Sequence, residues 1–257
     1  MLRLMLAMSC LMLIFAAGCG SQKVEQLPTI TPQVVPTETQ MPTATIDWFP
    51  RTPTPTLFVP AATATPIPTL IDPGYTQIQI DEAFAEAENW STGQSKEGNI
   101  TLEDKALVLA IPGPKSELIS LSTYRLPSEF FLETNVDVSL CSTGDAYGVV
   151  FWRFSEMGTY TFLVNCQGQF RIERKINAAF AVLVDWTVGS RIQPGSPSRH
   201  IISIWAKDGV VKFFVDGTPQ YELQTRKQLQ GGLGLIARSA SDLPETVIFS
   251  NLTVTKP

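Results

Sequence analysis

The chain has 257 residues, a formal net charge of −5 and no cluster of lysine and arginine residues, which argues against a nucleic-acid partner. It contains a single histidine, and only two of its four cysteines lie beyond residue 19, which is too few ligands of the right kind for a zinc site. We therefore expect no cofactor and no metal; calcium, which takes oxygen ligands, is the metal that this composition leaves open.

Residues 1–18 have the pattern of an export signal. Arg3 supplies the positive charge, an apolar run from Leu4 to Phe15 follows, and small residues precede Cys19. The run is shorter than the ~20 residues that a membrane-spanning helix needs. This favours a cleaved signal peptide over a short transmembrane anchor.

The sequence AAGC at residues 16–19 resembles the bacterial lipoprotein box, although Ala16 stands where leucine is usual. The resemblance implies that Cys19 becomes the N-terminus and carries acyl chains such as palmitate. Each buried methylene adds ~0.8 kcal/mol of membrane affinity. We expect an exported protein, lipid-anchored to the outer face of a bacterial membrane with its domain extracytoplasmic. Ordinary secretion is the alternative.

Residues 19–73 are predicted to follow as a lipidated cysteine and a disordered Thr/Pro-rich linker. From Gln22 to Pro73 the chain holds 11 of its 19 prolines and 12 threonines. Proline keeps the backbone extended and cannot join a β-ladder, so this segment is typical of a semi-rigid stalk. In the polyproline form it would reach on the order of 150 Å.

Residues 74–257 are predicted to form one all-β domain. Apolar, β-branched and aromatic runs recur about every ten residues, with Gly, Pro, Asp or Asn between them, as in a sandwich or barrel. Asp208-Gly209 predicts a tight hairpin turn, and further turns are predicted at 165–169 and 215–219.

Two shorter stretches of this domain also have a predicted form. Residues 81–89, DEAFAEAEN, have apolar spacing that is poorly helical, so we expect a strand end followed by a loop. Residues 97–111 are expected to form a hairpin with its turn at 103–105.

Outside the signal two cysteines remain, Cys141 and Cys166. In an exported chain an even count suggests one disulfide, and two free buried thiols are the alternative. If the strands at 130–140, 147–154 and 160–165 form an antiparallel meander, both cysteines finish at the same end of one sheet.

The motifs of this domain, in chain order, are DEAFAEAENWSTG (81–93), FFLETNVDV (130–138), YGVVFWRF (147–154), YTFLVNCQGQFRIER (160–174), LVDWT (183–187), HIISIWAKDGVVKFFVDG (200–217) and the ending GGLGLIARS with VIFSNLTV (231–239 and 247–254). Their order resembles the concanavalin A-like, laminin-G-like jelly rolls of bacterial surface proteins and their 3-keto-disaccharide hydrolase (family-16-like) relatives. The resemblance covers roughly residues 76–256. It implies a two-sheet antiparallel jelly-roll sandwich, and it fits a pairing of Cys141 with Cys166.

Glycoside hydrolysis needs two carboxylates about 5–10 Å apart. The nearest candidates are Glu133 and Asp137, which share one face of their strand but lie ~13 Å apart on a flat strand. A solvated polar face is therefore the favoured interpretation, and no catalytic residue is assigned. His200 is the single histidine, and the chain has no Gly-x-Ser-x-Gly nucleophile motif with which it could form a catalytic triad.

The 3-keto-glycoside relatives usually have an arginine directly after the phenylalanine of their Gly-Val-x-Phe-Arg motif. In this chain Trp152 separates Phe151 from Arg153. Strict alternation would then turn Arg153 to the opposite face, which counts against the same chemistry.

Carbohydrate recognition rests on aromatic rings that stack on sugars, with polar groups beside them. Trp152 and Phe154 share one face of their strand, and Tyr160 and Phe162 share one face of the next. These rings would form a platform on a concave sheet if the strands pair, although aromatic residues at period two are more often core. The polar candidates are Asp145, Arg153 and Asn165; the tryptophans Trp90, Trp186 and Trp205 are assigned to the core or its rim.

Together these patterns predict a surface lipoprotein whose monomeric domain binds a glycan or cell-wall polysaccharide without hydrolysing it. A glycoside or 3-keto-glycoside hydrolase or lyase is the enzyme alternative, and a protein–protein adhesion or sensing module is the second.

Overall fold

A computed structural model of the chain describes residues 74–153, 158–177, 179–226 and 230–256. The predicted signal peptide, Cys19 and the Thr/Pro-rich linker lie outside these residues. The strands are β1 (Gln77–Glu82), β2 (Gly93–Gln94), β3 (Asn99–Glu103), β4 (Ala106–Ile111), β5 (Glu117–Leu126), β6 (Phe130–Leu140), β7 (Ala146–Arg153), β8 (Thr159–Asn165), β9 (Gln169–Ile176), β10 (Ala179–Val188), β11 (Ser198–Lys207), β12 (Val210–Val215), β13 (Thr218–Gln224), β14 (Gly231–Arg238) and β15 (Glu245–Lys256). A single 3-10 turn, η1 (Ala87–Asn89), is the helical part of these residues, and none of their helices has the length and apolarity to cross a membrane.

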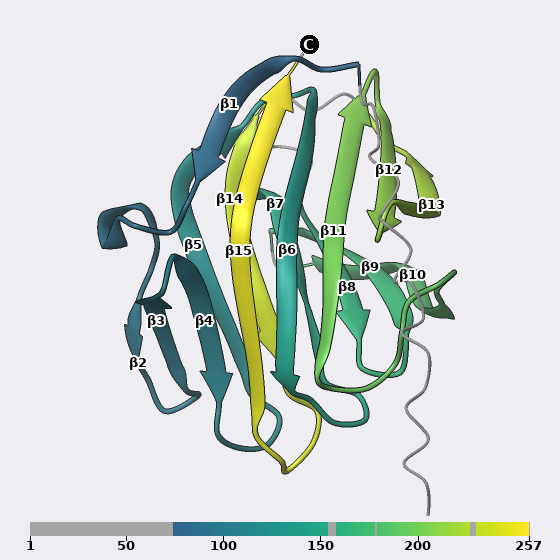
Figure 1. Cartoon of the computed structure of the whole chain (residues 1–257). Helices are drawn as coiled ribbons and strands as arrows, with labels where there is room; N and C mark the ends of the chain where they lie inside the picture. The colour runs from purple at the N-terminus through teal and green to yellow at the C-terminus, as the bar shows by residue number, and fades with distance from the viewer. Residues whose placement is uncertain (1–73, 154–157, 178, 227–229, 257) are drawn as a thin grey trace, which may run out of the picture. The chain divides into compact units, whose positions relative to one another are not determined.

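The strands form two antiparallel sheets that face each other (Figure 1). The nine-stranded sheet has the order β13-β12-β11-β6-β15-β4-β3-β2, with β1 paired to β15; the six-stranded sheet has the order β10-β9-β8-β7-β14-β5. Consecutive strands such as β6 and β7 lie in different sheets, as in a jelly roll. The predicted all-β jelly-roll sandwich is confirmed.

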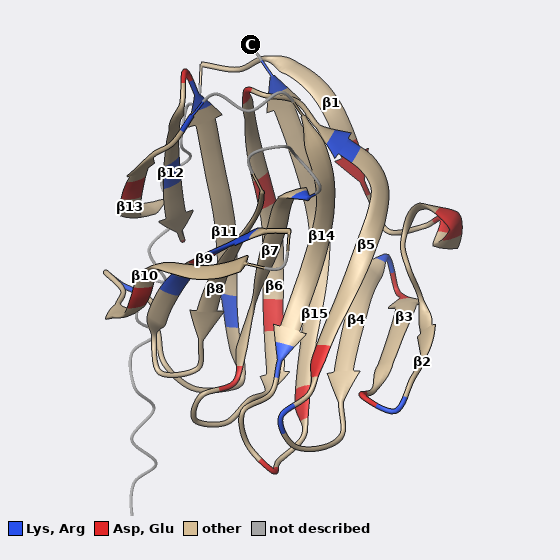
Figure 2. Ribbon diagram, turned by 180° about the vertical axis from the view of Figure 1, so that it is seen from behind, with Lys and Arg blue, Asp and Glu red and all other residues tan. Residues whose placement is uncertain are grey.

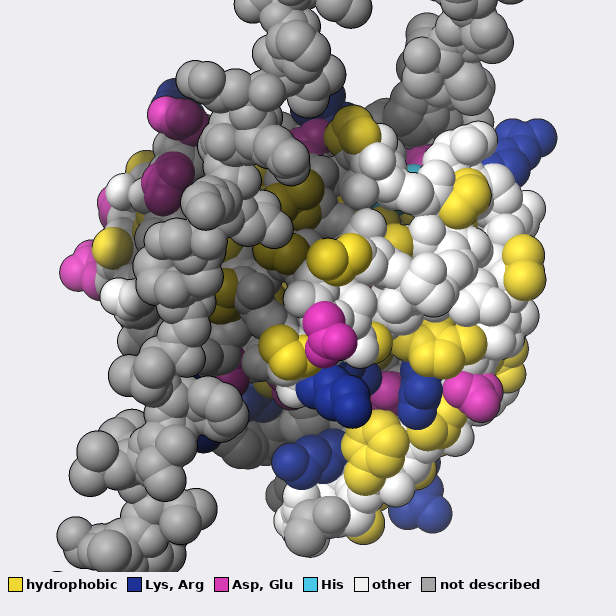
Figure 3. Space-filling view, turned by 90° about the horizontal axis from the view of Figure 1, so that it is seen from below, with side chains coloured by type: hydrophobic (Ala, Val, Ile, Leu, Met, Phe, Trp, Pro, Cys, Tyr) yellow, Lys and Arg dark blue, Asp and Glu magenta, His cyan; other side chains and the backbone are white. Residues whose placement is uncertain are grey.

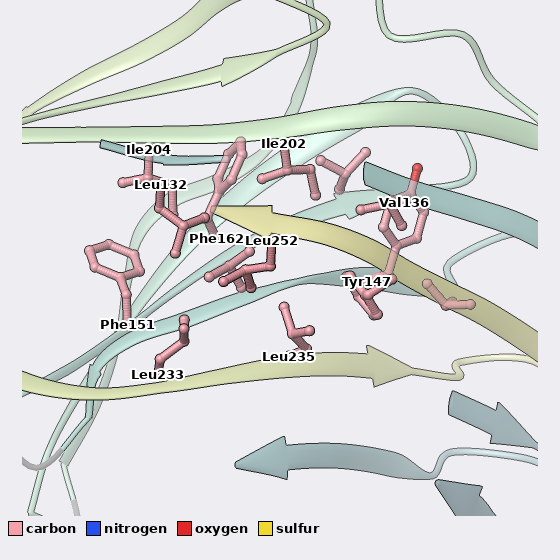
Figure 4. Close-up of a cluster of buried hydrophobic side chains, with 14 of the residues drawn as sticks. Leu132, Val136, Tyr147, Phe151, Phe162, Ile202, Ile204, Leu233, Leu235 and Leu252 are labelled. Carbon is pink, nitrogen blue, oxygen red and sulfur yellow. The ribbon is translucent and has the colours of Figure 1, made fainter. Parts of the chain in front are cut away.

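The core lies between the two sheets. Leu132, Ile202 and Ile204 from the nine-stranded sheet point toward Phe151 and Leu235 from the six-stranded sheet (Figure 4). These side chains follow the period-two alternation of their strands, because one face of each sheet is buried against the other. The predicted hairpin turns also form, at Asp208-Gly209 between β11 and β12 and at residues 103–105 between β3 and β4.

The predicted disulfide between Cys141 and Cys166 is confirmed, with 6.2 Å between the two Cα atoms. The predicted meander around it is wrong. Cys141 follows β6 of the nine-stranded sheet, whereas Cys166 follows β8 of the six-stranded sheet. The bridge therefore joins the two layers of the sandwich and not two strands of one sheet.

Candidate functional site

The six-stranded sheet carries a cleft of about 720 Å³ on the face that points away from the core. We call it the open-face cleft; its described lining residues come from all six strands, from the β9–β10 turn and from Gly158, directly before β8. Figure 2 shows this sheet from behind: β9 and β10 run at a steep angle to β14 and β5, so the sheet is strongly twisted. In the view from below, charged and hydrophobic side chains gather together in the lower half of the molecule (Figure 3).

A β-bulge in β7 decides which side chains of that strand reach the cleft. The ladder with β14 gains one residue between Val150 and Arg153, and Trp152 has a left-handed backbone, with φ of 50°. Phe151 and Trp152 consequently both point into the core, and Arg153 returns to the open face. Gly231 of β14 makes room for the bulge, because a Cβ there would lie 2.3 Å from the Cα of Trp152.

This bulge overturns the predicted facing of Arg153. Strict alternation places Arg153 on the face of Phe151, but the extra residue Trp152 shifts the parity of the strand, and Arg153 lines the cleft. Burial lowers the pKa of Arg153 from the ordinary arginine value. The expected orientation of Arg153, which counted against the chemistry of the 3-keto-glycoside relatives, is therefore not the observed one.

An ion-pair network crosses the open face. Arg238 on β14 donates hydrogen bonds from Nη1 and Nη2 to the two carboxylate oxygens of Glu173 at 3.0 and 3.1 Å, and from Nε to Glu117 at 2.7 Å. The Nε of Arg171 lies 3.0 Å from Glu173 as an ion pair without hydrogen-bond geometry, and its Nη1 lies 3.5 Å from Asp185. Burial acts to lower the pKa of Arg238, but the hydrogen bonds and charges of Glu173 and Glu117 outweigh it and raise that pKa.

Beneath this network lies a small apolar cluster, separate from the main core. Its buried members are Ala146, Val150, Leu163 and Ile236. Trp186 of β10 packs against them, and the guanidinium of Arg171 lies over its ring at 5.6 Å from the centroid. A second bulge places Asp185 and Trp186 together opposite Arg171, because the β9–β10 ladder shifts between Val184 and Thr187.

Two rings of β10 lie on the open face although the sequence predicts neither of them there. Trp186 was assigned to the core or its rim, whereas it belongs to the open face; Phe180 was assigned no role, yet it lines the cleft and is 57% exposed. The two register shifts break the period-two pattern of this strand. The face of either ring therefore does not follow from period-two alternation along β10.

Trp152 and Tyr160, two of the rings predicted to bind ligand, are not among the described residues that line the open-face cleft. Trp152 is 2% exposed and donates its indole N–H to the carbonyl of Pro127 at 3.0 Å; Tyr160 is 1% exposed and its hydroxyl lies 2.8 Å from that of Thr225. Both rings belong to the core cluster and are covered, so neither offers its face to a sugar, although Tyr160 is among the described lining residues of a second, smaller cleft. Phe154 lies outside the described residues.

The predicted polar residues Asp145 and Asn165 are buried at the other end of the sheet. The Asp145 carboxylate accepts hydrogen bonds from the backbone N–H groups of Ser142 and Ala240 at 2.7 and 2.8 Å, which ties the β6–β7 loop to the β14–β15 loop. The Asn165 Oδ1 accepts the N–H of Gln169 at 2.9 Å and closes the β8–β9 turn. Their described contacts organise loops, and neither residue is among the described residues of the open-face cleft.

Glu133 and Asp137 lie on the outer face of β6, in the nine-stranded sheet. Asp137 pairs with Arg199 of β11, and Glu133 accepts a hydrogen bond from the hydroxyl of Ser203 at 3.1 Å. The open-face cleft belongs to the other sheet, so this pair does not contribute to it.

A smaller cleft of about 530 Å³, the edge cleft, lies between the edge strands β10 and β13. Leu183 lines it from β10, Leu223 from β13, and Arg226 from the segment after β13. Arg174 lines both this cleft and the open-face cleft. The described linings of the two clefts therefore share one residue.

The sandwich interior also holds buried titratable groups. Burial and then the negative charge of Asp145 raise the pKa of Glu245 to about 9. His200 pairs through Nδ1 with Asp216 at 2.9 Å and stacks on Tyr147, whose pKa burial raises. In the part of the chain that the structure describes, no three His, Cys, Asp or Glu residues are grouped to hold a metal ion.

No protein-family model matches the chain, and no curated protein matches it significantly. Several solved structures share its fold. A Bacillus subtilis protein of unknown function with a galectin-like fold has a TM-score of 0.55 at 10% identity over 71% of this chain and 97% of its own. A β-1,3-1,4-glucanase (lichenase) from a mouse hindgut metagenome has a TM-score of 0.53 at 12% identity over 71% and 100%. The laminarinase catalytic domain of Thermotoga maritima has a TM-score of 0.53 at 10% identity over 71% and 99%. At these identities the likeness shows a shared galectin-like, concanavalin A-like jelly roll.

Proposed function

We propose that the protein binds a glycan in the open-face cleft. The observation that carries the proposal is the chemistry of that cleft, which combines the exposed ring of Phe180 with the hydroxyls of Thr159 and Thr161 and the amide of Asn177. A ring face packs on the apolar side of a sugar, while hydroxyl, amide and charged groups orient its hydroxyls.

We propose further that the glycan is bound without being hydrolysed. A glycosidase needs one carboxylic acid that donates a proton and a second carboxylate that acts as nucleophile or base. Glu117 and Glu173, the carboxylates among the described residues of the cleft, both pair with Arg238. Both carboxylates are therefore engaged by one guanidinium, and the described lining offers no other carboxylate to act on a bound sugar.

Hydrolysis of the bound glycan is the second candidate. It is favoured by the fold shared with the lichenase and the laminarinase, which are glucan-degrading enzymes. Release of reducing ends from a panel of glucans and 3-keto-glycosides separates the two candidates. Turnover that disappears in Glu117→Gln or Glu173→Gln would establish the enzyme, and the binding proposal expects none.

The binding test compares two exposed residues of β10. Phe180→Ala removes the ring from the cleft and should weaken retention on a glycan array by about two- to tenfold, the worth of one aromatic contact. Val188→Ala on the same strand is the matched control, because Val188 is exposed and is not among the described lining residues. Equal retention of both variants and the unmodified protein would contradict the proposal, as would binding of no glycan at all.

The membrane anchor is proposed on the sequence alone: a lipid on Cys19 with the stalk at 22–73 holding the domain away from the outer face of a bacterial membrane. In cells fed labelled palmitate, the full-length chain should become labelled and partition into detergent, while Cys19→Ala should do neither. Equal labelling of the full-length chain and Cys19→Ala would show that the lipid is attached to another residue. Labelling of neither protein would contradict the proposed lipid anchor.

A further inference from the structure

The open-face cleft extends across the whole six-stranded sheet. The two edge strands of that sheet are β5 and β10, with β14, β7, β8 and β9 between them. Ile119 of β5 lines the cleft at one edge, and Phe180 of β10 lines it at the other. Neighbouring strands lie about 4.8 Å apart, so the path from edge to edge measures about 24 Å along the sheet.

The described lining is continuous between these edges. Its cross-strand neighbours are Phe180 with Lys175, Lys175 with Thr159, Thr161 with Val150, and Ile236 with Ile119. Thr159 and Thr161 are two residues apart on β8 and therefore share one face of that strand. Val150 of β7 and Ile236 of β14 complete the series, because both belong to the small apolar cluster. The open-face cleft is thus one path from β10 to β5.

Both ends of this path reach solvent. Phe180 and Ile119 are exposed, whereas Val150 and Ile236 in the middle are buried. A wall at either end would pack over the apolar side chain beside it and bury that side chain. A bound chain therefore has room to continue beyond either edge of the sheet.

The chemistry of the path differs between its edges and its middle. Phe180 and Ile119 offer apolar contacts at the edges, and the hydroxyl of Thr161 and the half-buried guanidinium of Arg238 lie between them. The apolar faces of sugar rings pack on groups of the first kind, and sugar hydroxyls bind groups of the second kind. A ligand that contacts both edges must also span the polar middle.

We infer that the cleft binds an interior segment of a longer glycan chain, with Phe180 and Ile119 as the contacts at the two ends of that segment. One sugar residue with its linkage is about as long as the spacing between neighbouring strands, so the segment has about five residues. The cleft volume of about 720 Å³ agrees, since clefts of this size bury ligands much larger than one sugar. The inference rests on the proposed glycan-binding function and adds the length of the ligand and its position along the chain.

The test measures how the affinity of the full-length protein depends on ligand length. The ligands are laminari-, cello-, xylo- and chito-oligosaccharides of increasing length, from the monosaccharide to the octasaccharide. In a series that binds, the affinity should rise about tenfold or more from the disaccharide to the pentasaccharide and change by less than about twofold beyond it. An affinity that is already complete at the mono- or disaccharide would overturn the inferred length and leave glycan binding intact.

A competition measurement separates interior segments from chain ends. The intact polysaccharide of the same linkage should displace the bound pentasaccharide as well as the octasaccharide does at equal mass concentration. Chain ends are scarce in the polysaccharide, so much weaker displacement by the polysaccharide would show that the cleft binds a terminal sugar. That result would overturn the inference.

Variants at the two edges of the sheet then locate the ligand. Phe180→Ala should weaken the pentasaccharide about two- to tenfold and Ile119→Ala about two- to threefold. A disaccharide is too short to contact both edges, so at most one of the two variants should weaken its binding. Ile78→Ala is the matched control for Ile119→Ala and should change nothing, because Ile78 is exposed on β1 of the nine-stranded sheet. The melting temperature of each variant checks that the domain is folded.

The outcomes separate this inference from the function on which it rests. If one of the two edge variants alone weakened binding at every ligand length, the ligand would be confined to one end of the cleft. The inferred length would then be wrong, and glycan binding in the cleft would stand. If neither variant weakened any glycan, the glycan would bind outside the cleft, and both proposals would be overturned. Failure of every oligosaccharide and polysaccharide to bind would also overturn both.

Discussion

The outer faces of the two sheets differ in how they arrange their charges. On the nine-stranded sheet, Asp137 and Glu133 each interact with a residue of the adjacent strand β11, which leaves a solvated polar face. On the six-stranded sheet, Arg238 of β14 reaches Glu173 of β9 although β7 and β8 lie between them. On the nine-stranded sheet these polar contacts join adjacent strands, whereas on the six-stranded sheet the ion pair between Arg238 and Glu173 crosses two strands beside the open-face cleft.

The small residues of β7 explain the difference. Its open face carries Ala146, Gly148 and Val150. A Cβ at Gly148 would lie 1.9 Å from the carbonyl oxygen of Phe162 on β8, so only glycine permits this close approach of the two strands. With so little side-chain volume between them, Arg238 and Glu173 meet across the sheet. The small side chains of β7 therefore leave room for a cleft on the outer face of the six-stranded sheet.

The largest expected effect concerns Glu245, where the two sheets meet beside Asp145. Because burial raises its pKa to about 9, well above the ordinary value of a glutamate, the folded protein holds this proton more tightly than the unfolded chain. The resulting stabilisation is complete below about pH 4.5, is lost as pH rises toward 9, and amounts to several kcal/mol at about 1.4 kcal/mol per pKa unit. Urea unfolding at pH 5, 7 and 9 should show this decline in the wild type and a flatter profile in Glu245→Gln. Parallel profiles would contradict the assignment.

The two faces of the six-stranded sheet can be compared through two aromatic residues. Trp152→Ala should lower the free energy of unfolding by about 4 kcal/mol, because it empties a packed core site and leaves the carbonyl of Pro127 without its donor. Phe180→Ala should change it by less than about 0.5 kcal/mol while weakening glycan retention. If the Trp152→Ala protein were fully stable but no longer bound glycan, Trp152 would be a ligand-binding residue and not a core residue.

The disulfide tests how far the two layers depend on each other. Replacing Cys141 and Cys166 together by serine opens a loop with a sequence separation of 25, which should cost about 3 kcal/mol by the chain-entropy estimate. The melting temperature of the oxidised wild type should fall to that of the double variant on reduction. A reduced protein as stable as the oxidised one would show that the core alone holds the layers together.

The smallest expected effects compare the two outer faces directly. Glu173→Gln should cost about 2 kcal/mol, because it removes the charge that compensates Arg238 and Arg171, although the partial exposure of Arg238 lets water replace some of it. Asp137→Asn should cost less than about 1 kcal/mol, as expected for a pair whose arginine is largely exposed. Equal costs would mean that the long-range network adds nothing beyond a surface pair.

Much of the fold was predictable because its signals are local. Turn residues such as Asp208-Gly209 and the period-two alternation of β6 depend on a few neighbouring residues, and both appear in the structure as predicted. The site was less predictable, because its residues are placed by bulges. In β7 one extra residue changes the facing of Arg153, in β10 two register shifts each add one residue, and none of these bulges has a local signal as strong as a turn.

The amino-acid sequence by itself therefore determined the strands, their turns and the identity of the two cysteines that pair. Only the tertiary structure decided that β6 and β7 belong to different sheets, that Trp152 lies in the core, and that Arg153 reaches the cleft. The physical reason is that a bulge is stabilised by its partner strand. Trp152 adopts its left-handed backbone where Gly231, 79 positions along the chain, leaves room for it.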